Sequence, residues 1–340
     1  MNQRVMSQRD QAGQVKLVEG TGPITKMLPM GEFLEVYKRD VTFRLRTPDS
    51  IDPDRTNVNL PWVTSPVAWV GSSHPAIARV LIQSDELLNH ATLAPGKQRQ
   101  DLMLHLHACK EALLACDAVA IRVGGRVKAI VEAIQSAGLS IDSSGHGLNP
   151  FPQVEDLDAD CVTFLVQANR AVKLISQVPS YFLELAKQCN NFDHLGRALR
   201  ARIGESPLCI FVEENSEFIA KIAALRNFQE HPAPEKKTVV RNFHLLPNGS
   251  VSVPTWFIVG SDDETAGAIH LDMQVIAESL VEIAEILVVH LVMQTLSSSF
   301  PYALEMIPEA EMDADAPIRF RLGLDFSQIQ FEEVRADPRP

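Results

Sequence analysis

The stretch Asp272–Leu296, DMQVIAESLVEIAEILVVHLVMQTL, decides the fold class of this chain. Its large apolar residues recur every three or four positions and fall on one helical face: Ile276, Leu280, Ile283, Leu287 and Leu291. The opposite face carries the acidic residues Glu278, Glu282 and Glu285. A helix with one long apolar face has to bury that face against other elements, so the stretch predicts a helical bundle.

The same helical periodicity dominates the chain upstream of this stretch. Ser206 followed by Pro207 is typical of a helix N-cap with proline at the first helical position. Gly124-Gly125 and Pro179 are expected to break or kink the pattern. Helices are therefore expected over residues 75–89, 95–121, 126–137, 154–177, 181–189, 193–203 and 207–231. The predicted fold class is mainly α, a helical bundle across residues 96–300.

One segment within this bundle changes from a helical period to a strand period. Residues 238–259 hold two apolar runs on either side of Pro247-Asn248-Gly249-Ser250. An Asn-Gly pair between such runs predicts a β-hairpin, here inserted into the bundle. Pro254 is expected to keep the second strand at a sheet edge, because proline has no N–H to donate.

The remaining parts of the chain are expected outside the bundle. Residues 1–29 are polar and without a period, which is typical of a flexible tail. Residues 30–95 are expected to be an irregular α+β segment that wraps the helices, with a short strand at the alternating residues 41–46. Residues 301–340 are expected to be an acidic C-terminal extension with a strand at 318–324.

Composition restricts the classes of function. The 340 residues carry a net charge of -12, which argues against a wide basic face that coats nucleic acid but leaves room for a small basic cleft. The 5 cysteines include no C-x-x-C pair, so neither a disulfide framework nor a zinc ribbon is expected. Reduced thiols, no secretory signal and no apolar run of bilayer length together predict a cytoplasmic protein with no membrane association.

The stretch Arg226-Asn227-Phe228-Gln229-Glu230-His231 points most directly to a chemistry. A guanidinium holds phosphate oxygens in a planar fork, and an imidazole transfers protons near neutral pH. The stretch lies where the helix that begins after Ser206 is expected to end. Several basic residues are expected near this stretch: Arg197, Arg200, Lys236, Lys237 and Arg241. They can form a local positive cleft for RNA, or they can simply lie on ordinary solvated faces.

Arg226, Asn227 and His231 match, one by one, the signature of the HEPN family of helical bundles, which the stretch resembles. That signature is arginine, about four to six residues and then histidine, with a polar residue directly after the arginine. The resemblance covers about residues 154–296. It implies a homodimeric, metal-independent endoribonuclease that needs no cofactor, as in a toxin or defence component. It also implies roles: Arg226 holds the scissile phosphate, Asn227 positions the phosphate or the imidazole, and His231 transfers the proton of the ribose 2′-OH. The inserted hairpin departs from the compact family pattern.

A second interpretation of the same residues stays open. Cations near the last helical carbonyls are favoured by the helix dipole, so these residues can also be a C-terminal cap. The protein would then be a non-catalytic helical module for dimerisation or for binding a protein partner. The bare spacing is a weak signal, because Arg99 and His105 satisfy it inside another expected helix.

Three further polar clusters contain residue types that can bind a metal. His105, His107 and Cys109 share a face only in a strand, and the leucines around them favour a helix, so packed or solvated side chains are expected. The acidic runs 155–160 and 262–264 lack the glycine and terminal glutamate of a calcium loop and are expected to be helix-start and loop acids. No metal ligand is therefore predicted. His290 is expected to be a packed core residue.

Overall fold

The computed structural model describes residues 9, 17–260, 266–296 and 302–324. Helices make up about 49% of it and strands 17%. Among these residues four small antiparallel sheets accompany the helices, so the chain mixes helix and sheet and is less purely α than predicted. It divides into two compact units. The first unit comprises residues 1–99 and 289–340, and the second comprises residues 100–288.

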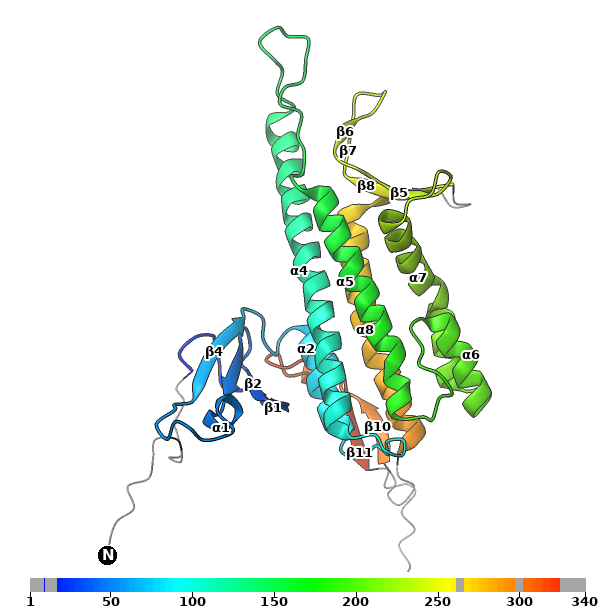
Figure 1. Cartoon of the computed structure of the whole chain (residues 1–340). Helices are drawn as coiled ribbons and strands as arrows, with labels where there is room; N and C mark the ends of the chain where they lie inside the picture. The colour runs from blue at the N-terminus through cyan, green and yellow to red at the C-terminus, as the bar shows by residue number, and fades with distance from the viewer. Residues whose placement is uncertain (1–8, 10–16, 261–265, 297–301, 325–340) are drawn as a thin grey trace, which may run out of the picture. The chain divides into compact units, whose positions relative to one another are not determined.

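A four-stranded antiparallel sheet forms the N-terminal part of the first unit (Figure 1). Its strands follow in the order β1 (Lys26–Met30), β2 (Phe33–Tyr37), β3 (Thr42–Arg46) and β4 (Val63–Ala68). Strand β3 confirms the prediction for residues 41–46, since Phe43 and Leu45 are buried and Arg46 is exposed. Residues 30–95 are more regular than expected, because β4 forms within a stretch whose prolines and polar residues suggested a loop.

The C-terminal strands belong to this same unit. β10 (Tyr302–Met306) and β11 (Phe320–Leu324) form an antiparallel pair, which confirms the strand predicted at 318–324. Gln83 opens the short helix α3 (Gln83–Leu87), and its Oε1 accepts the backbone N–H groups of Arg319 at 2.7 Å and Phe320 at 2.8 Å. One buried side-chain amide thus joins the expected C-terminal extension to the N-terminal segment. The other short elements are α1 (Pro48–Ile51), α2 (Pro75–Ile77), the π-helical turn Ala78–Ile82 and the 3-10 turn Glu309–Glu311.

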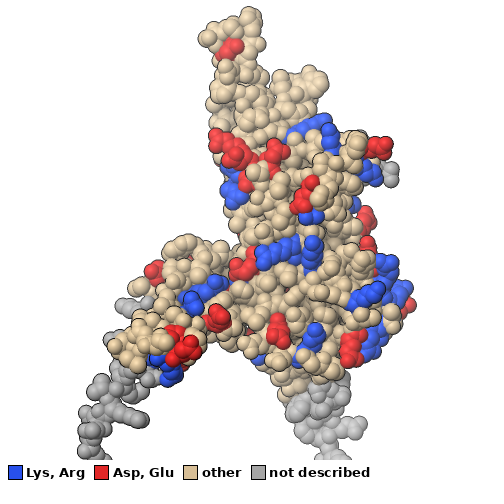
Figure 2. Space-filling model, in the orientation of Figure 1, with Lys and Arg blue, Asp and Glu red and all other residues tan. Residues whose placement is uncertain are grey.

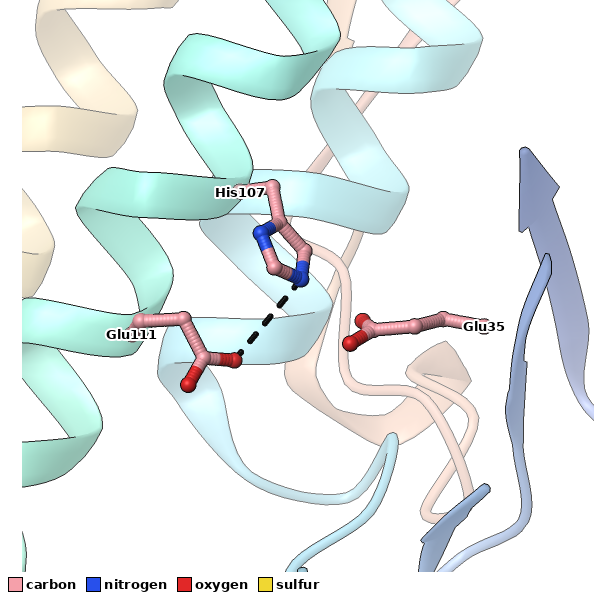
Figure 3. Close-up of side chains that lie close together, drawn as sticks. All are labelled: Glu35, His107 and Glu111. Carbon is pink, nitrogen blue, oxygen red and sulfur yellow. Dashed lines mark ion pairs between the residues drawn. The ribbon is translucent and has the colours of Figure 1, made fainter. Parts of the chain in front are cut away.

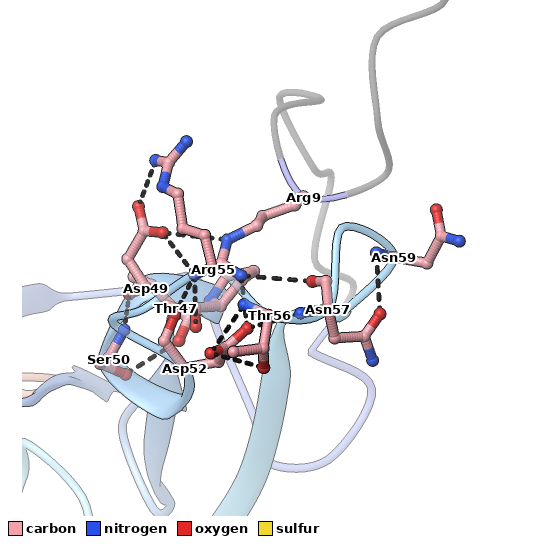
Figure 4. A network of polar contacts seen from close by, with 10 residues as sticks. Arg9, Thr47, Asp49, Ser50, Asp52, Arg55, Thr56, Asn57 and Asn59 are labelled. Carbon is pink, nitrogen blue, oxygen red and sulfur yellow. Dashed lines mark hydrogen bonds and ion pairs between the residues drawn. The ribbon is translucent and has the colours of Figure 1, made fainter.

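Arg9 is anchored in the loop after β3 (Figure 4). Its guanidinium donates to Asp49 Oδ1 at 2.7 Å, Asp52 Oδ2 at 2.8 Å and the Asn57 carbonyl at 3.2 Å. Hydrogen bonds from the Asn57 backbone and from Arg9 hold the pKa of Asp52 well below its usual range. Arg9 is therefore held in place, although it lies in the stretch expected to be a flexible tail.

Five long helices form the body of the second unit, and α4, α5, α7 and α8 run side by side in Figure 1. They are α4 (Arg99–Ala137), α5 (Leu157–Gln177), α6 (Phe192–Ile203), α7 (Pro207–Glu230) and α8 (Ile269–Thr295). α7 begins as predicted, since Ser206 Oγ accepts the Cys209 N–H at 3.3 Å and Pro207 takes the first helical position. Among the helices that the structure describes, none is both long and apolar enough to cross a membrane.

Two predictions about helix breaks were wrong. Gly124-Gly125 do not interrupt α4, which continues because Val123 and Val127 are buried on either side. Each glycine costs a helix roughly 0.5–1 kcal/mol relative to alanine, a penalty that packing of the apolar face offsets. Helix also does not resume over residues 181–189: α5 ends at Gln177 and a 3-10 turn follows over Val178–Tyr181. Pro179 lacks the N–H that a continued helix needs.

The inserted hairpin is confirmed. β5 (Lys237–Arg241) pairs with β8 (Thr255–Val259), and β6 (His244–Leu245) pairs with β7 (Val251–Ser252) beside a turn at Gly249, whose φ is +82°. The expectation for Pro254 was wrong, because β8 lies between β5 and β9 (Gly267–Ala268) and is the central strand. Pro254 precedes β8, where no ladder donor is needed, and its carbonyl accepts the Ile269 N–H at 3.0 Å.

Candidate functional site

The Arg-Asn-His motif lies at the C-terminal end of α7. The helix ends at Glu230, and His231 follows it with φ -130° and ψ 66°, outside the helical region. The His231 N–H still donates to the Asn227 carbonyl at 2.8 Å, which closes the last turn. Pro232 then has no N–H with which to extend the helix. Arg226 and Asn227 thus occupy the last turn, and His231 stands just beyond it.

Glu230 connects the two functional groups of this motif. Its carboxylate forms an ion pair with the Arg226 guanidinium, and its Oε2 lies 4.0 Å from His231 Nε2. Arg226 also donates to Asn227 Oδ1 at 3.1 Å, while its Nε is buried and has no hydrogen-bond partner among the residues that the structure describes. Sequence reasoning missed Glu230, although its place four residues after Arg226 is the spacing at which helical side chains pair.

The two cationic groups differ in their access to solvent. The His231 side chain is 77% exposed, whereas those of Arg226 and Glu230 are 25% and 26% exposed. The imidazole can therefore reach a ligand without rearrangement. The guanidinium has to exchange part of its contact with Glu230 before it can grip a phosphate.

The side chains of the motif do not cap the helix. Among the described residues, no hydrogen bond runs from the side chain of Arg226, Asn227 or His231 to a helix carbonyl. The Thr238 hydroxyl of β5 donates to the Leu225 carbonyl at 2.8 Å and so ties this strand to α7, but that carbonyl lies within the helix and is not one of its terminal carbonyls. The side chains of the motif are thus not used on helix carbonyls in the way that the cap interpretation expected, although Arg226 is paired with Glu230.

A pocket of about 340 Å³ lies beside the motif, between α6 and α7. Asn227 and Phe228 line it at the motif end, and Asn191, Phe192 and Asp193 line it from the start of α6. Its floor consists of apolar residues of α7, including Ile219, Ala220 and Ala223. Lys236 Nζ lies 6.0 Å from the centre of the Phe228 ring, so a cation stands next to the pocket. The pocket thus combines an apolar floor, an aromatic side chain and one amide of the motif.

The basic residues predicted around the motif are only partly free. Arg200 pairs with Glu213 at 2.7 Å, Arg197 donates to the Asp193 carbonyl at 3.2 Å, and the Arg241 guanidinium stacks 4.7 Å from the Phe257 ring centre. Lys236 is placed beside the motif residue Phe228, and Lys237 is exposed on β5. The face in Figure 2 accordingly shows basic and acidic side chains interspersed, without a continuous basic field.

The second Arg–His pair, Arg99 and His105, has a structural role. His105 lies on α4, and its Nε2 is 2.7 Å from the Leu174 carbonyl oxygen of α5. Its ring packs 5.3 Å from that of Tyr181, and burial lowers the pKa of His105. Arg99 donates to the Asp85 carbonyl at 2.7 Å. This histidine is therefore a packed residue that links two helices.

The predicted helical setting of His107 and Cys109 is confirmed. His107 faces Glu111 one turn later on α4, with Nε2 and Oε1 3.7 Å apart (Figure 3). Burial raises the pKa of the Cys109 thiol to about 12, so it stays protonated and poorly suited to bind a metal. Glu35, also drawn in Figure 3, belongs to the first unit, where its carboxylate accepts hydrogen bonds from Tyr37 and Arg44.

The remaining candidates also have structural roles where the structure describes them. Asp160 on α5 pairs with two arginines of α4, Arg122 at 2.5 Å and Arg126, and so joins these helices. Residues 262–264 lie outside the described residues. His290 is half-buried in α8, and burial lowers its pKa, as expected for a packed residue.

Comparison with known proteins adds no relative. No family model matches the chain, and neither a curated protein nor a solved structure matches it.

Proposed function

We propose that the exposed end of α7 is the active centre of a metal-independent endoribonuclease of the HEPN type, with residues 154–296 as its HEPN-like bundle. The observation that supports this most is the joint placement of Arg226, Asn227 and His231 at one solvent-reachable helix end, where, among the described residues, none of their side chains is hydrogen-bonded to a helix carbonyl. A guanidinium, an amide and an imidazole are sufficient in kind to cleave a phosphodiester without a metal. Such an enzyme would act on cytoplasmic RNA, as a toxin or defence component does.

The proposed reaction is a transesterification within RNA. His231 takes the proton of a ribose 2′-OH, and the 2′-oxygen attacks the adjacent phosphorus. The bond from phosphorus to the 5′-oxygen breaks, and that oxygen leaves with a proton from an imidazolium. Arg226 stabilises the charge on the phosphorane, and Asn227 positions the phosphate or the imidazole. The products carry a 2′,3′-cyclic phosphate and a 5′-hydroxyl.

Glu230 has two consequences for this mechanism. Its carboxylate occupies the Arg226 guanidinium in the free protein, so the RNA phosphate has to displace it. The same carboxylate already lies 4.0 Å from His231 Nε2, so once it leaves Arg226 it can orient that ring, as carboxylates orient histidines in other acid–base sites. We therefore assign Glu230 a positioning role that the motif alone does not suggest.

The pocket between α6 and α7 suits the base next to the scissile phosphate. Asn227 belongs to the motif and also lines the pocket, so a nucleotide bound in the pocket is within reach of the motif. Phe228 offers an aromatic surface, and aromatic side chains with neighbouring cations are the usual means of binding single-stranded nucleic acid. Lys236 supplies that cation. We propose single-stranded RNA as the substrate and a homodimer as the active form, in which a second copy can supply the proton for the leaving oxygen.

Cleavage of single-stranded RNA in the presence of a chelator tests this function. The purified chain should produce 2′,3′-cyclic phosphate ends, detected by mass spectrometry, and an RNA with a 2′-deoxy sugar at the scissile position should stay intact. His231→Ala should abolish the product. His194→Ala provides the matched control, because His194 is an exposed histidine on α6. Intact RNA after incubation with the wild-type protein would rule the proposal out.

A second candidate function is a non-catalytic module that dimerises or binds a protein partner. The ion pair between Arg226 and Glu230 favours it, because a neutralised guanidinium binds phosphate less strongly. The substitution Glu230→Gln separates the two candidates. If neither the wild type nor Glu230→Gln cleaves or binds RNA, only the interaction module remains as a candidate.

A further inference from the structure

The sheet formed by β5, β8 and β9 has one face against the helices of the second unit. Trp256 of β8 is 2% exposed, its ring centre lies 6.3 Å from that of Phe164 on α5, and its indole donates to Asp272 Oδ2 on α8 at 2.6 Å. Thr238 of β5 lies on the same face, and its hydroxyl donates to the Leu225 carbonyl of α7. Contacts with three helices therefore fix which face of this sheet is turned away from the bundle.

The opposite face of the sheet carries two cations and an aromatic ring. Side chains of a strand alternate between the two faces, and residues paired across strands share a face. Lys237, Val239 and Arg241 of β5 therefore lie on this outer face, and Phe257 joins them because it pairs with Val239. Lys237 and Arg241 are exposed, while Val239 and Phe257 are partly exposed. The Arg241 guanidinium stacks 4.7 Å from the Phe257 ring centre, so a cation and an aromatic ring form one composite surface.

The charge of this region differs from that of the chain as a whole. Residues 236–260 contain three lysine or arginine residues and no acidic residue, whereas the whole chain carries a net charge of -12. Among the described residues, no carboxylate forms an ion pair with Lys237 or Arg241. Arg226, by contrast, is paired with Glu230. An anionic ligand can therefore reach the cations of the outer face without displacing the carboxylate of a described residue.

The sheet follows directly on the proposed active centre. β5 begins at Lys237, six residues after His231, and Figure 1 shows β5 and β8 beside the C-terminal end of α7. Lys236 precedes β5, and its Nζ lies 6.0 Å from the ring centre of Phe228, which lines the pocket between α6 and α7. Phe228 and Phe257 are thus two aromatic rings that each have a cation next to them. Surfaces that bind single-stranded nucleic acid combine rings and guanidinium planes, on which bases stack, with cations that hold the backbone.

We propose that the outer face of this sheet is a second subsite for single-stranded RNA, where a base stacks on the Phe257 and Arg241 pair and Lys237 contacts the backbone. This inference rests on the proposed function, because it takes the RNA cleaved at the end of α7 as the ligand. At roughly 3.3 Å per residue, Lys237 and Arg241 lie about 13 Å apart along β5, several times the spacing of roughly 3.4 Å between stacked nucleotides. An RNA that reaches both the motif and the stacked pair is therefore several nucleotides long.

Binding of an RNA that resists cleavage tests this subsite without involving the chemistry. Fluorescence anisotropy of the full chain with a single-stranded 2′-O-methyl RNA of about ten nucleotides measures the affinity. Phe257→Ala should weaken binding by about five- to 150-fold, the range for loss of one stacked base. Trp69→Ala is the matched control, because Trp69 is an aromatic residue of the first unit and is 72% exposed. This control should bind the RNA as tightly as the wild type does.

The salt dependence of the same binding separates charge from stacking. Lys237→Ala should reduce the steepness of log affinity against log salt concentration by about 0.7, because one phosphate contact is lost. Phe257→Ala should leave that steepness unchanged. Lys237 is exposed on β5, so its replacement tests the subsite even if Phe257→Ala is unstable. Lys173→Ala is the control, because Lys173 is an exposed lysine on α5, and it should change neither affinity nor steepness.

The outcomes distinguish this subsite from the proposed nuclease. Affinity that is unchanged in both Phe257→Ala and Lys237→Ala, or a wild type that does not bind the RNA, overturns the subsite. Binding that depends on Phe257, together with an unmodified RNA that the wild type leaves intact, supports the subsite and overturns the nuclease. A polyglutamate peptide that binds as tightly as the RNA and is weakened by the same two variants would assign the outer face to acidic protein segments and overturn the RNA assignment.

Discussion

Arg99–His105 and Arg226–His231 present the same residue types at similar spacing in two regions of the molecule, yet their surroundings differ. His105 lies inside α4, where it contacts the Leu174 carbonyl and burial lowers its pKa. His231 lies one residue beyond α7 and is 77% exposed. The position of the histidine relative to the helix end, more than its spacing from arginine, determines whether its ring is available to a substrate.

The neighbours of the two histidines show the same difference. A ring packed between two helices needs a partner on each side, and His105 has Leu174 and Tyr181. His231 lies beside the carboxylate of Glu230, and Pro232 follows it in the chain. Substitution should therefore affect stability at the first histidine and chemistry at the second.

The largest expected effect is on RNA cleavage. His231→Ala removes the proposed proton-transfer group and should lower the cleavage rate by about 10²–10⁴-fold. Because the side chain is exposed, the free energy of unfolding should change by less than about 0.5 kcal/mol. Single-turnover kinetics on a labelled RNA and urea unfolding measure the two quantities. Equal loss of activity in His194→Ala would contradict the assignment.

The next effect is on stability and concerns the other histidine. His105→Ala removes the contact with the Leu174 carbonyl and the packing on Tyr181, and should lower the free energy of unfolding by about 1–3 kcal/mol. Urea unfolding followed by circular dichroism measures it, with His231→Ala as the comparison. If the two variants unfold at the same urea concentration, the structural role of His105 is wrong.

A smaller effect is expected at Glu230. Glu230→Gln frees Arg226 from a partly buried ion pair of roughly 0.4–1 kcal/mol, so affinity for RNA should rise about two- to fivefold. Fluorescence anisotropy with a 2′-O-methyl RNA, which cannot be cleaved in this way, measures binding alone. Glu217→Gln is the control, since Glu217 forms an ion pair of the same i,i+4 spacing on the same helix, with Lys221 at 3.2 Å. Unchanged or weaker binding in Glu230→Gln would show that phosphate does not compete for Arg226.

The smallest effect is a pH dependence of stability. Burial lowers the pKa of His105, so below about pH 6.5 the unfolded chain binds a proton that the folded chain does not. Stability should therefore fall as the pH drops through that value. Burial also lowers the pKa of His270 and of His290, so both contribute to the same dependence of stability on pH. His105→Asn should flatten the slope of unfolding free energy against pH between about 6.5 and 5. An unchanged slope would contradict a neutral, buried His105.

Local signals in the sequence predicted the elements that depend on neighbouring residues. Ser206-Pro207 located the start of α7, and Asn248-Gly249 located the hairpin turn, because caps and turns are short-range structures. The continuity of α4 through Gly124-Gly125 could not be predicted in this way. It depends on burial of Val123 and Val127 by distant parts of the chain.

The candidate site likewise combines features set by neighbouring residues with features set by distant ones. The helix end and its three motif residues were predictable, since Pro232 marks the end of α7. The hydrogen bond from the Thr238 hydroxyl to the Leu225 carbonyl was not, because it joins the helix to the hairpin that follows. The contact of Gln83 with Arg319 and Phe320 is a long-range example, with partners 236 and 237 positions apart in the chain.

The most direct test of the account is an NMR titration of the histidine rings. Selectively labelled protein is mixed with a single-stranded RNA whose 2′-hydroxyls are blocked, and the ring signals of His231 and His194 are followed. The His231 signal should shift on addition of RNA, and this shift should disappear in Arg226→Ala, while the His194 signal stays unchanged. A His231 signal that does not respond to RNA would contradict the claim that a phosphate reaches the end of α7.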